Sequence, residues 1–464
     1  MLIIKNLFYN SLSVFIARAT NSIGYLLLTR FISPEIFGLF TLIQVFTNLG
    51  SIIIDPGISQ ILVRSRDSRE QLFTTALYLS LFNALIFSIA TYYIAPYIIP
   101  SESFKAFNNA YYLIIIYYFT IAFQTPSKAS LEKNGQFKRI AFIEASSYII
   151  SLSCSFILTY FKYDLEALIS LNLVSQTIIT TVFYLSIKTS LNFRKFDSEL
   201  LKRIIFEIRY LMFTRVSFLV ISNIEKVIIP RVNNISTLGI YNTSIRINNL
   251  PIQFSTNAFN RVLLPHYSKS DLTSIKKEHL SIITVLTSLL APFYIVLLIF
   301  NNELASFMNK DWHNIAFFLK YGALTLLPGL FGILNESFLI ATNQTKLIFY
   351  VNIIERTTKL LTISSLFFTD IETFIYLECL RAFTIVTLIS YICLKKINVT
   401  LCEITKVYTR PLVLLIIATL FYTIFNCFEL NMYFCIFIFI SLAYSYILLS
   451  FKTLIRKLLT RIKK

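Results

Sequence analysis

Residues 280–300 read LSIITVLTSLLAPFYIVLLIF and contain no charged side chain. A helix needs about 20 mostly apolar residues to cross the hydrocarbon core of a bilayer, and this stretch supplies them. Similar runs recur along the whole chain of 464 residues, of which 56% are apolar and only 14% are charged. A soluble protein of this size carries far more surface charge. The sequence therefore predicts an all-α integral membrane protein without a large catalytic or nucleotide-binding domain outside the membrane.

The apolar runs are separated by charged and turn residues, and this pattern predicts about fourteen transmembrane helices. The predicted spans are 8–32, 37–61, 71–99, 109–131, 140–160, 165–187, 210–231, 240–264, 280–300, 317–341, 349–369, 372–394, 410–427 and 432–451.

The 42 Lys and Arg residues exceed the 24 Asp and Glu residues, which gives a net charge of +18. Most of the excess lies in one set of alternate connections between spans, whereas the opposite set contains only Lys105, Lys162 and Lys310. Basic loops of membrane proteins are enriched on the cytoplasmic side. We therefore predict that both termini are cytoplasmic, and the charge needs no nucleic-acid partner to explain it.

A short segment of the chain is repeated. Residues 30–40, RFISPEIFGLF, align with residues 231–241, RVNNISTLGIY, so that Gly38 coincides with Gly239. Both copies are expected in an outer loop that follows an odd-numbered span, so they have the same orientation, as in transporters built from parallel repeats. This predicts two six-helix lobes, 1–200 and 201–396, followed at 397–464 by two additional helices and a basic cytoplasmic tail.

Some basic side chains fall deep inside the predicted spans, where a lipid-facing charge costs roughly 2.5–3.5 kcal/mol. Such residues either pair with an acid or line a hydrated cavity. Side chains on one helix meet at i,i+3 or i,i+4. Glu378 is therefore predicted to pair with Arg381, and Glu355 with Lys359.

The other deep basic residues have no acid at either spacing and are predicted to form a cationic cavity. Acids on neighbouring helices, Asp55, Glu144 or Glu336, remain alternative partners for them. A guanidinium matches the oxygens of a diphosphate in geometry and charge, so the cavity favours an anionic cargo. The predicted diphosphate-binding residues are Arg18, Arg215, Lys226, Arg246 and Arg356.

Several pieces of the chain resemble the polysaccharide-transporter family, whose best-known members are the O-antigen flippases. They are residues 30–40, residues 55–59 (DPGIS) with the basic residues that follow, and residues 239–251 (GIYNTSIRINNLP) with the later VLLP at 262–265. The same superfamily contains the multidrug and toxin exporters and the lipid II flippase. The lipid II flippase has an acid beside its first-helix arginine, whereas Arg18 here is flanked by alanines.

The resemblance implies a V-shaped pair of six-helix bundles that open alternately to the two sides of a bacterial inner membrane. Its cargo would be an undecaprenyl-diphosphate-linked oligosaccharide, such as the O-antigen repeat used in lipopolysaccharide biosynthesis. Such proteins need no cofactor or metal and are not enzymes; a polysaccharide polymerase and a chain-length regulator are the expected partners. We name Asp55 and Glu225 as candidates for ion coupling, because both carboxylates lie on helices that line the cavity in this family.

Two other functions remain open from the sequence. One is a membrane enzyme, an O-antigen polymerase or ligase, but Glu303, Asp311 and His313 in the longest predicted outer loop, 301–316, form no catalytic arrangement. The other is a drug or ion exporter of the same superfamily. Exporters of cations need acidic cavity residues, and the deep charges here are mainly basic.

Overall fold

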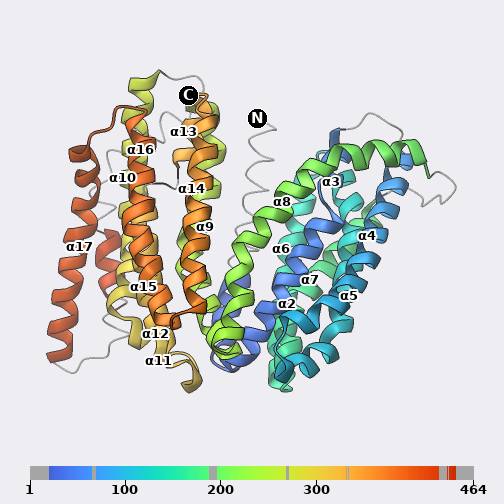
Figure 1. Ribbon diagram of the computed structural model, residues 1–464, viewed down its shortest axis with the longest axis horizontal. Coiled ribbons are helices and arrows are strands. Elements are labelled where there is room, and N and C mark those ends of the chain that lie inside the picture. The colour runs from blue at the N-terminus through green and yellow to red at the C-terminus, as the bar shows by residue number, and fades with distance from the viewer. Residues whose placement is uncertain are drawn as a thin grey trace. The chain divides into compact units, whose positions relative to one another are not determined.

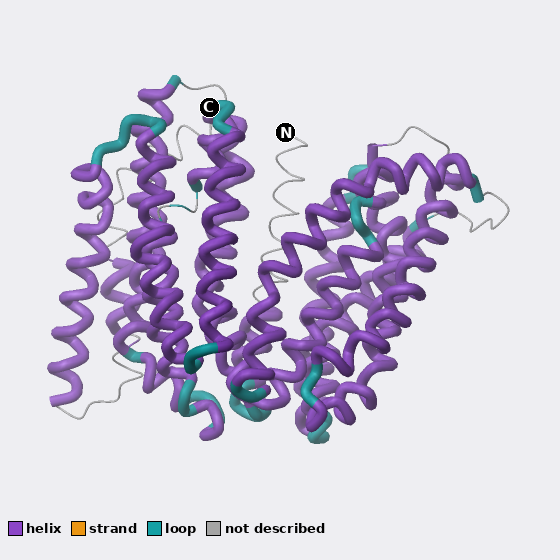
Figure 2. Tube along the Cα trace, viewed as in Figure 1, coloured by secondary structure: helices purple, strands orange, loops and turns teal. Residues whose placement is uncertain are grey.

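The computed structural model describes residues 20–64, 69–187, 196–267, 271–330, 332, 334–427, 436 and 438–445. These ranges contain helices joined by short loops and no β-strand (Figure 2). Helices suit a bilayer because they satisfy every backbone hydrogen bond within one segment. The predicted all-α fold is confirmed.

Helices lie at every predicted span between residues 37 and 427 (Figure 1). Within the described residues, 7 helical segments are long and apolar enough to cross a membrane. The helices are α2 (Pro34–Ile54), α3 (Ile58–Arg64), α4 (Arg69–Ile98), α5 (Ser101–Lys133), α6 (Phe137–Tyr160), α7 (Asp164–Ser186), α8 (Ser198–Val232), α9 (Ile235–Tyr267), α10 (Leu272–Ile299), α11 (Asn301–Ser306), α12 (Ile315–Gly329), α13 (Asn335–Ala341), α14 (Thr345–Ser364), α15 (Ile371–Arg381), α16 (Thr387–Lys395) and α17 (Leu401–Cys427).

Three predicted spans are interrupted in the structure. The span at 37–61 divides into α2 and α3, with residues 55–57 between them. The span at 317–341 divides into α12 and α13, and Pro328 and Gly329 lie at the end of α12. Proline lacks an amide hydrogen and glycine is a weak helix former, which explains the break. The span at 372–394 stays helical, but a π-helix at Ala382–Val386 separates α15 from α16.

Helix α8 begins well before its predicted span. Asp197 caps it, because the Asp197 carboxylate accepts hydrogen bonds from the backbone amides of Glu199 and Leu200. Leu200, Ile204 and Ile208 then bury one face against residues of α3, α4 and α5. The hydrophilic stretch predicted at 188–209 is thus helical from Ser198 onward, and residues 188–195 lie outside the described ranges.

The chain forms two compact units, residues 1–242 and 243–464. In the first unit, α6 packs along α7, α5 contacts α4 and α7, and α8 packs on α2. In the second unit, α10 packs against α12 and α17, and α12 contacts α15. The predicted lobe boundaries at residues 200 and 396 stay predictions.

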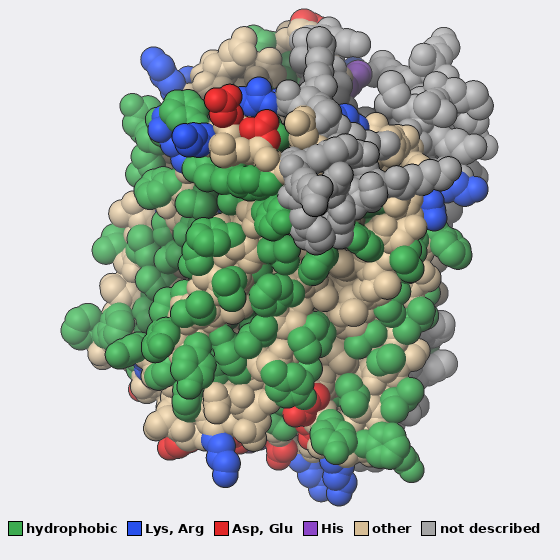
Figure 3. All heavy atoms as spheres, turned by 90° about the vertical axis from the view of Figure 1, so that its right-hand side faces the viewer, with side chains coloured by type: hydrophobic (Ala, Val, Ile, Leu, Met, Phe, Trp, Pro, Cys, Tyr) green, Lys and Arg blue, Asp and Glu red, His purple; other side chains and the backbone are tan. Residues whose placement is uncertain are grey.

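The first unit has an apolar belt. Figure 3 shows hydrophobic side chains over the middle of one face, with charged side chains gathered toward its upper and lower ends. Large apolar residues of α4 and α5, among them Phe82, Tyr93 and Tyr112, are exposed. A belt of this kind is what a bilayer would cover, since lipid replaces water around exposed apolar side chains.

The two copies of the repeated segment contact each other within the first unit. A Cβ atom on Gly38 would overlap the carbonyl oxygen of Ile235, and one on Gly239 would overlap the carbonyl oxygen of Pro34. Pro34 and Ile235 are themselves equivalent residues of the two copies. The contact is therefore symmetric, and only glycine at both positions lets the two backbones approach this closely.

One hydrogen bond continues this symmetry. The Asn242 side-chain amide donates to the Thr41 hydroxyl over 2.9 Å, and the two residues are separated by 201 positions, the same offset as the repeat. The sequence placed both copies in loops, but α2 already begins at Pro34 and α9 at Ile235. The repeat is thus a helix crossing, which we call the glycine crossing (residues 34–41 and 235–242).

Candidate functional site

The predicted diphosphate-binding residues are distributed over both units. Arg215 and Lys226 are half-buried on α8 in the first unit. Arg246 on α9 and Arg356 on α14 are half-buried in the second unit. Arg18 lies outside the described residues. That these side chains share one cavity stays a prediction.

Arg215 and Lys226 lie on the same helix but far apart along it. A separation of eleven residues corresponds to about 16 Å along the helix axis. One phosphate group cannot touch both side chains at once.

The two candidates for ion coupling differ in their surroundings. Asp55 follows the end of α2, and its Oδ1 accepts hydrogen bonds from the backbone amides of Gly57 at 3.2 Å and Ser59 at 3.1 Å. These bonds stabilise the turn from α2 into α3. Glu225 is buried on α8, with 4% of its surface exposed. The role of either carboxylate in ion coupling stays a prediction.

An acid that the sequence offered as a possible partner for the deep arginines pairs with a lysine instead. The Glu144 carboxylate on α6 lies 2.8 Å from Lys128 Nζ on α5. Helical spacing along one helix could not reveal this pair, because the partners are 16 residues apart on two helices. Lys128 is thus an interhelical ion-pair partner.

The predicted ion pair between Glu378 and Arg381 is confirmed. Arg381 Nη2 lies 2.7 Å from Glu378 Oε2, and Arg381 Nε lies 3.2 Å from both carboxylate oxygens. Only 12% of the Glu378 side chain and 10% of the Arg381 side chain are exposed. The pair carries no net charge, and a lone charge at this depth would be costly.

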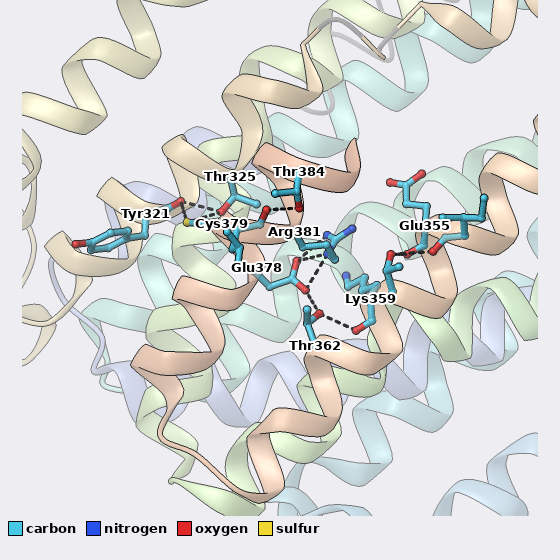
Figure 4. Close-up of polar contacts among 12 residues, drawn as sticks. Tyr321, Thr325, Glu355, Lys359, Thr362, Glu378, Cys379, Arg381 and Thr384 are labelled. Carbon is cyan, nitrogen blue, oxygen red and sulfur yellow. Dashed lines mark hydrogen bonds and ion pairs between the residues drawn. The ribbon is translucent and has the colours of Figure 1, made fainter. Parts of the chain in front are cut away.

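A residue of a neighbouring helix also contacts this ion pair. The Thr362 hydroxyl of α14 donates to Glu378 Oε1 on α15, so the cluster joins two helices (Figure 4). Figure 4 also shows the Glu355 carboxylate pointing away from Lys359. Glu355 is exposed and its carboxylate does not face Lys359, so the expected pair between Glu355 and Lys359 is wrong.

The second unit contains an apolar cavity of about 530 Å³. Leu298, Leu327, Leu394 and Leu415 are among its lining residues, which come from α10, α12, α16 and α17. Among the described residues, no charged side chain lines it. A cavity of this kind favours hydrocarbon over an anion, so it is not the site of a diphosphate.

Comparison with known proteins identifies the family. A family model described as "Polysaccharide biosynthesis protein" matches residues 27–316. The chain belongs to this family. The matched range contains the glycine crossing, Asp55, Arg215, Lys226 and Arg246, whereas Arg18 and Arg356 lie outside it. A search of curated proteins finds no match to the chain.

Solved structures show the same fold. A lipid II flippase, MurJ, in an inward closed conformation is similar over 96% of this chain and 99% of that chain, with a TM-score of 0.69 and 16% identity. An inward-facing multidrug resistance MATE family transporter of the MOP superfamily is similar over 84% and 99% of the two chains, with a TM-score of 0.60 and 12% identity. This member of the polysaccharide biosynthesis family thus has the MurJ and MATE transporter fold.

Proposed function

We propose that the protein is a flippase that moves an undecaprenyl-diphosphate-linked oligosaccharide, such as an O-antigen repeat unit, from the cytoplasmic to the periplasmic leaflet. The observation that carries this proposal is the combination of family and fold: a polysaccharide biosynthesis chain with the fold of a lipid II flippase over 96% of its length. The protein would lie in a bacterial inner membrane with both termini in the cytoplasm, and it would perform no covalent chemistry.

The deep basic residues supply the chemistry that such a cargo needs. A diphosphate cannot enter hydrocarbon without a substitute for its hydration, and guanidinium groups provide paired donors for phosphate oxygens. We place the diphosphate against Arg18, Arg215 and Arg246, with Lys226 and Arg356 as further contacts. The lipid tail stays in the bilayer while the two lobes alternately open to each side.

Of the two candidates for ion coupling, we favour Glu225 over Asp55. Uptake of a proton at buried Glu225 would remove a charge next to Lys226 and change which conformation is favoured. Asp55 already serves the turn into α3. Replacing Glu225 by Gln should therefore abolish any dependence of transport on a proton gradient, whereas wild-type coupling in this variant would assign the role elsewhere.

Transport is tested with purified protein in liposomes. A fluorescent undecaprenyl-diphosphate-linked oligosaccharide is incorporated into both leaflets, and a membrane-impermeant quencher reports how fast the inner pool becomes accessible. Arg246→Ala should lose most of the rate. Lys277→Ala removes an exposed basic residue of α10 as the matched control and should keep it. Equal rates for wild type and Arg246→Ala would contradict the cavity assignment.

A deletion strain separates the flippase from the other candidate functions. Loss of a flippase traps the lipid-linked repeat in the cytoplasmic leaflet, whereas loss of a polymerase or ligase leaves it in the periplasmic leaflet. A cationic dye included in the liposome assay tests drug export. Transport of the dye without transport of the lipid-linked sugar would identify an exporter and overturn the proposal.

A further inference from the structure

The turn between α2 and α3 opens a cavity on the first unit. Gly57 lies in this turn with φ +134°, a backbone conformation that glycine adopts most readily. A Cβ atom there would lie 2.6 Å from Leu211 Cδ2 of α8, so glycine also lets α8 approach the turn. The resulting cavity has a volume of about 420 Å³ and is lined by α3 and α8.

The cavity brings together three kinds of polar side chain. Gln60 and Arg64 come from α3 and Glu207 comes from α8. Arg64 Nη2 lies 2.5 Å from Glu207 Oε2, and 75% of the Arg64 side chain and 35% of the Glu207 side chain are exposed. The Gln60 amide is exposed as well. An exposed ion pair adds little stability, so the pair is available to a ligand.

The same turns of α8 carry an exposed cluster of two aromatic rings and a guanidinium. The Arg209 guanidinium lies 3.8 Å from the centroid of the Phe206 ring and 4.6 Å from that of Tyr210, and it donates to the Tyr210 hydroxyl over 3.1 Å. Phe206 and Tyr210 are exposed. Cation–π contacts hold these rings and the guanidinium in one arrangement.

We infer that the cavity of Gln60, Arg64 and Glu207 binds a sugar ring of the glycan. Sugar hydroxyls donate and accept hydrogen bonds, and the cavity offers an amide, a guanidinium and a carboxylate that satisfy both roles. Its volume lies in the range of small-ligand pockets. The exposed Phe206 and Tyr210 rings on the same turns of α8 offer further apolar contacts to a longer glycan.

The charge of the cavity excludes the diphosphate as its ligand. Glu207 neutralises Arg64 at 2.5 Å, so the ion pair carries no net positive charge. The Glu207 carboxylate would repel the oxygens of a phosphate bound to Arg64, whereas it accepts hydrogen bonds from neutral sugar hydroxyls. The site is thus distinct from the deep basic residues. The inference depends on the proposed function for one point, which is that the bound sugar belongs to the glycan of the transported lipid.

Binding is tested with purified full-length protein and the oligosaccharide released by mild acid from the surface polysaccharide of the same strain. Affinity is measured by isothermal titration calorimetry for wild type, Glu207→Gln and Gln60→Ala. Glu207→Gln should bind about tenfold more weakly, which corresponds to about 1.4 kcal/mol, the size of one hydrogen bond to a charged group. Gln60→Ala removes hydrogen bonds from a neutral amide and should bind about three- to tenfold more weakly. Glu199→Gln, an exposed acid of the same helix, should bind as wild type does.

Competing ligands are tested in the same titrations. Inorganic diphosphate and phosphatidylglycerol micelles should not displace the oligosaccharide from wild type. Displacement by either, or unchanged affinity in both cavity variants, would overturn the inference. Unaltered thermal unfolding midpoints show that the variants are folded.

The inference and the proposed function fail in different ways. If wild type binds the oligosaccharide through Glu207 but moves no lipid-linked sugar in liposomes, the flippase function fails and the sugar site stands. If wild type moves lipid-linked sugar and Glu207→Gln binds it equally well, the site fails and the function stands.

Discussion

The glycine crossing in the first unit and the Glu378–Arg381 cluster in the second unit both join helices, but by opposite means. At the crossing, Gly38 and Gly239 have no side chains, so the two helix backbones are in contact. The Asn242 side chain adds one hydrogen bond to Thr41. In the cluster, long charged side chains are buried and Thr362 links them to the next helix. The first contact tolerates no added volume, whereas the second tolerates no unpaired charge.

The largest loss of stability is expected when the cluster loses one charge. Glu378→Ala leaves Arg381 buried without its partner, and breaking a buried pair costs about 3–5 kcal/mol. The free energy of unfolding is followed by the thermal unfolding midpoint in detergent. Replacing both residues, Glu378→Leu with Arg381→Met, should restore most of the loss, because no charge then remains. A double variant as unstable as Glu378→Ala would contradict the role assigned to charge.

A methyl group at the crossing should have the next largest effect. Gly38→Ala places a Cβ against the carbonyl oxygen of Ile235, and overpacking of this kind costs about 1–3 kcal/mol. Gly329→Ala is the matched control, because nothing lies within 4 Å of a Cβ there. If both variants unfold at the same temperature, the close approach of the two backbones does not contribute to stability.

The ion pair between α5 and α6 tests whether exposure sets the cost of losing a partner. Lys128 keeps 39% of its side chain exposed, against 10% for Arg381. Lys128 also lies near the end of α5, so its flexible side chain can extend toward the membrane surface after Glu144→Ala, and we expect a loss of about 1–2 kcal/mol. A loss equal to that of Glu378→Ala would show that exposure does not govern these pairs.

The smallest effect is expected from the hydrogen bond at the crossing. Asn242→Ala removes one bond, which is worth about 0.5–1.5 kcal/mol. Thr41 keeps a second partner, because its hydroxyl also donates to the carbonyl oxygen of Phe37 at 2.8 Å. In a double-mutant cycle with Thr41→Val, the two losses should be less than additive. Strict additivity would mean that the two side chains do not interact.

Part of the candidate site could be predicted and part could not, for one reason. Glu378 and Arg381 are three residues apart on one helix, so their contact follows from helix geometry. Thr362, Glu144 and Lys128 find their partners on other helices, and no local spacing encodes those contacts. Glu355 and Lys359 have the right spacing, but the structure turns Glu355 outward (Figure 4).

Apolar runs of bilayer length and the spacing of residues along single helices are local properties, so the membrane location, the helical spans and one ion pair could be read from the chain alone. The repeat at Gly38 and Gly239 was also visible in the sequence, but the contact between its two copies could not be predicted from it. Packing between distant segments turned the two glycines into a contact, paired Lys128 with Glu144, and brought Gln60 and Arg64 next to Glu207. Such contacts depend on the three-dimensional arrangement of helices, because the partners are separated by many residues and by whole spans.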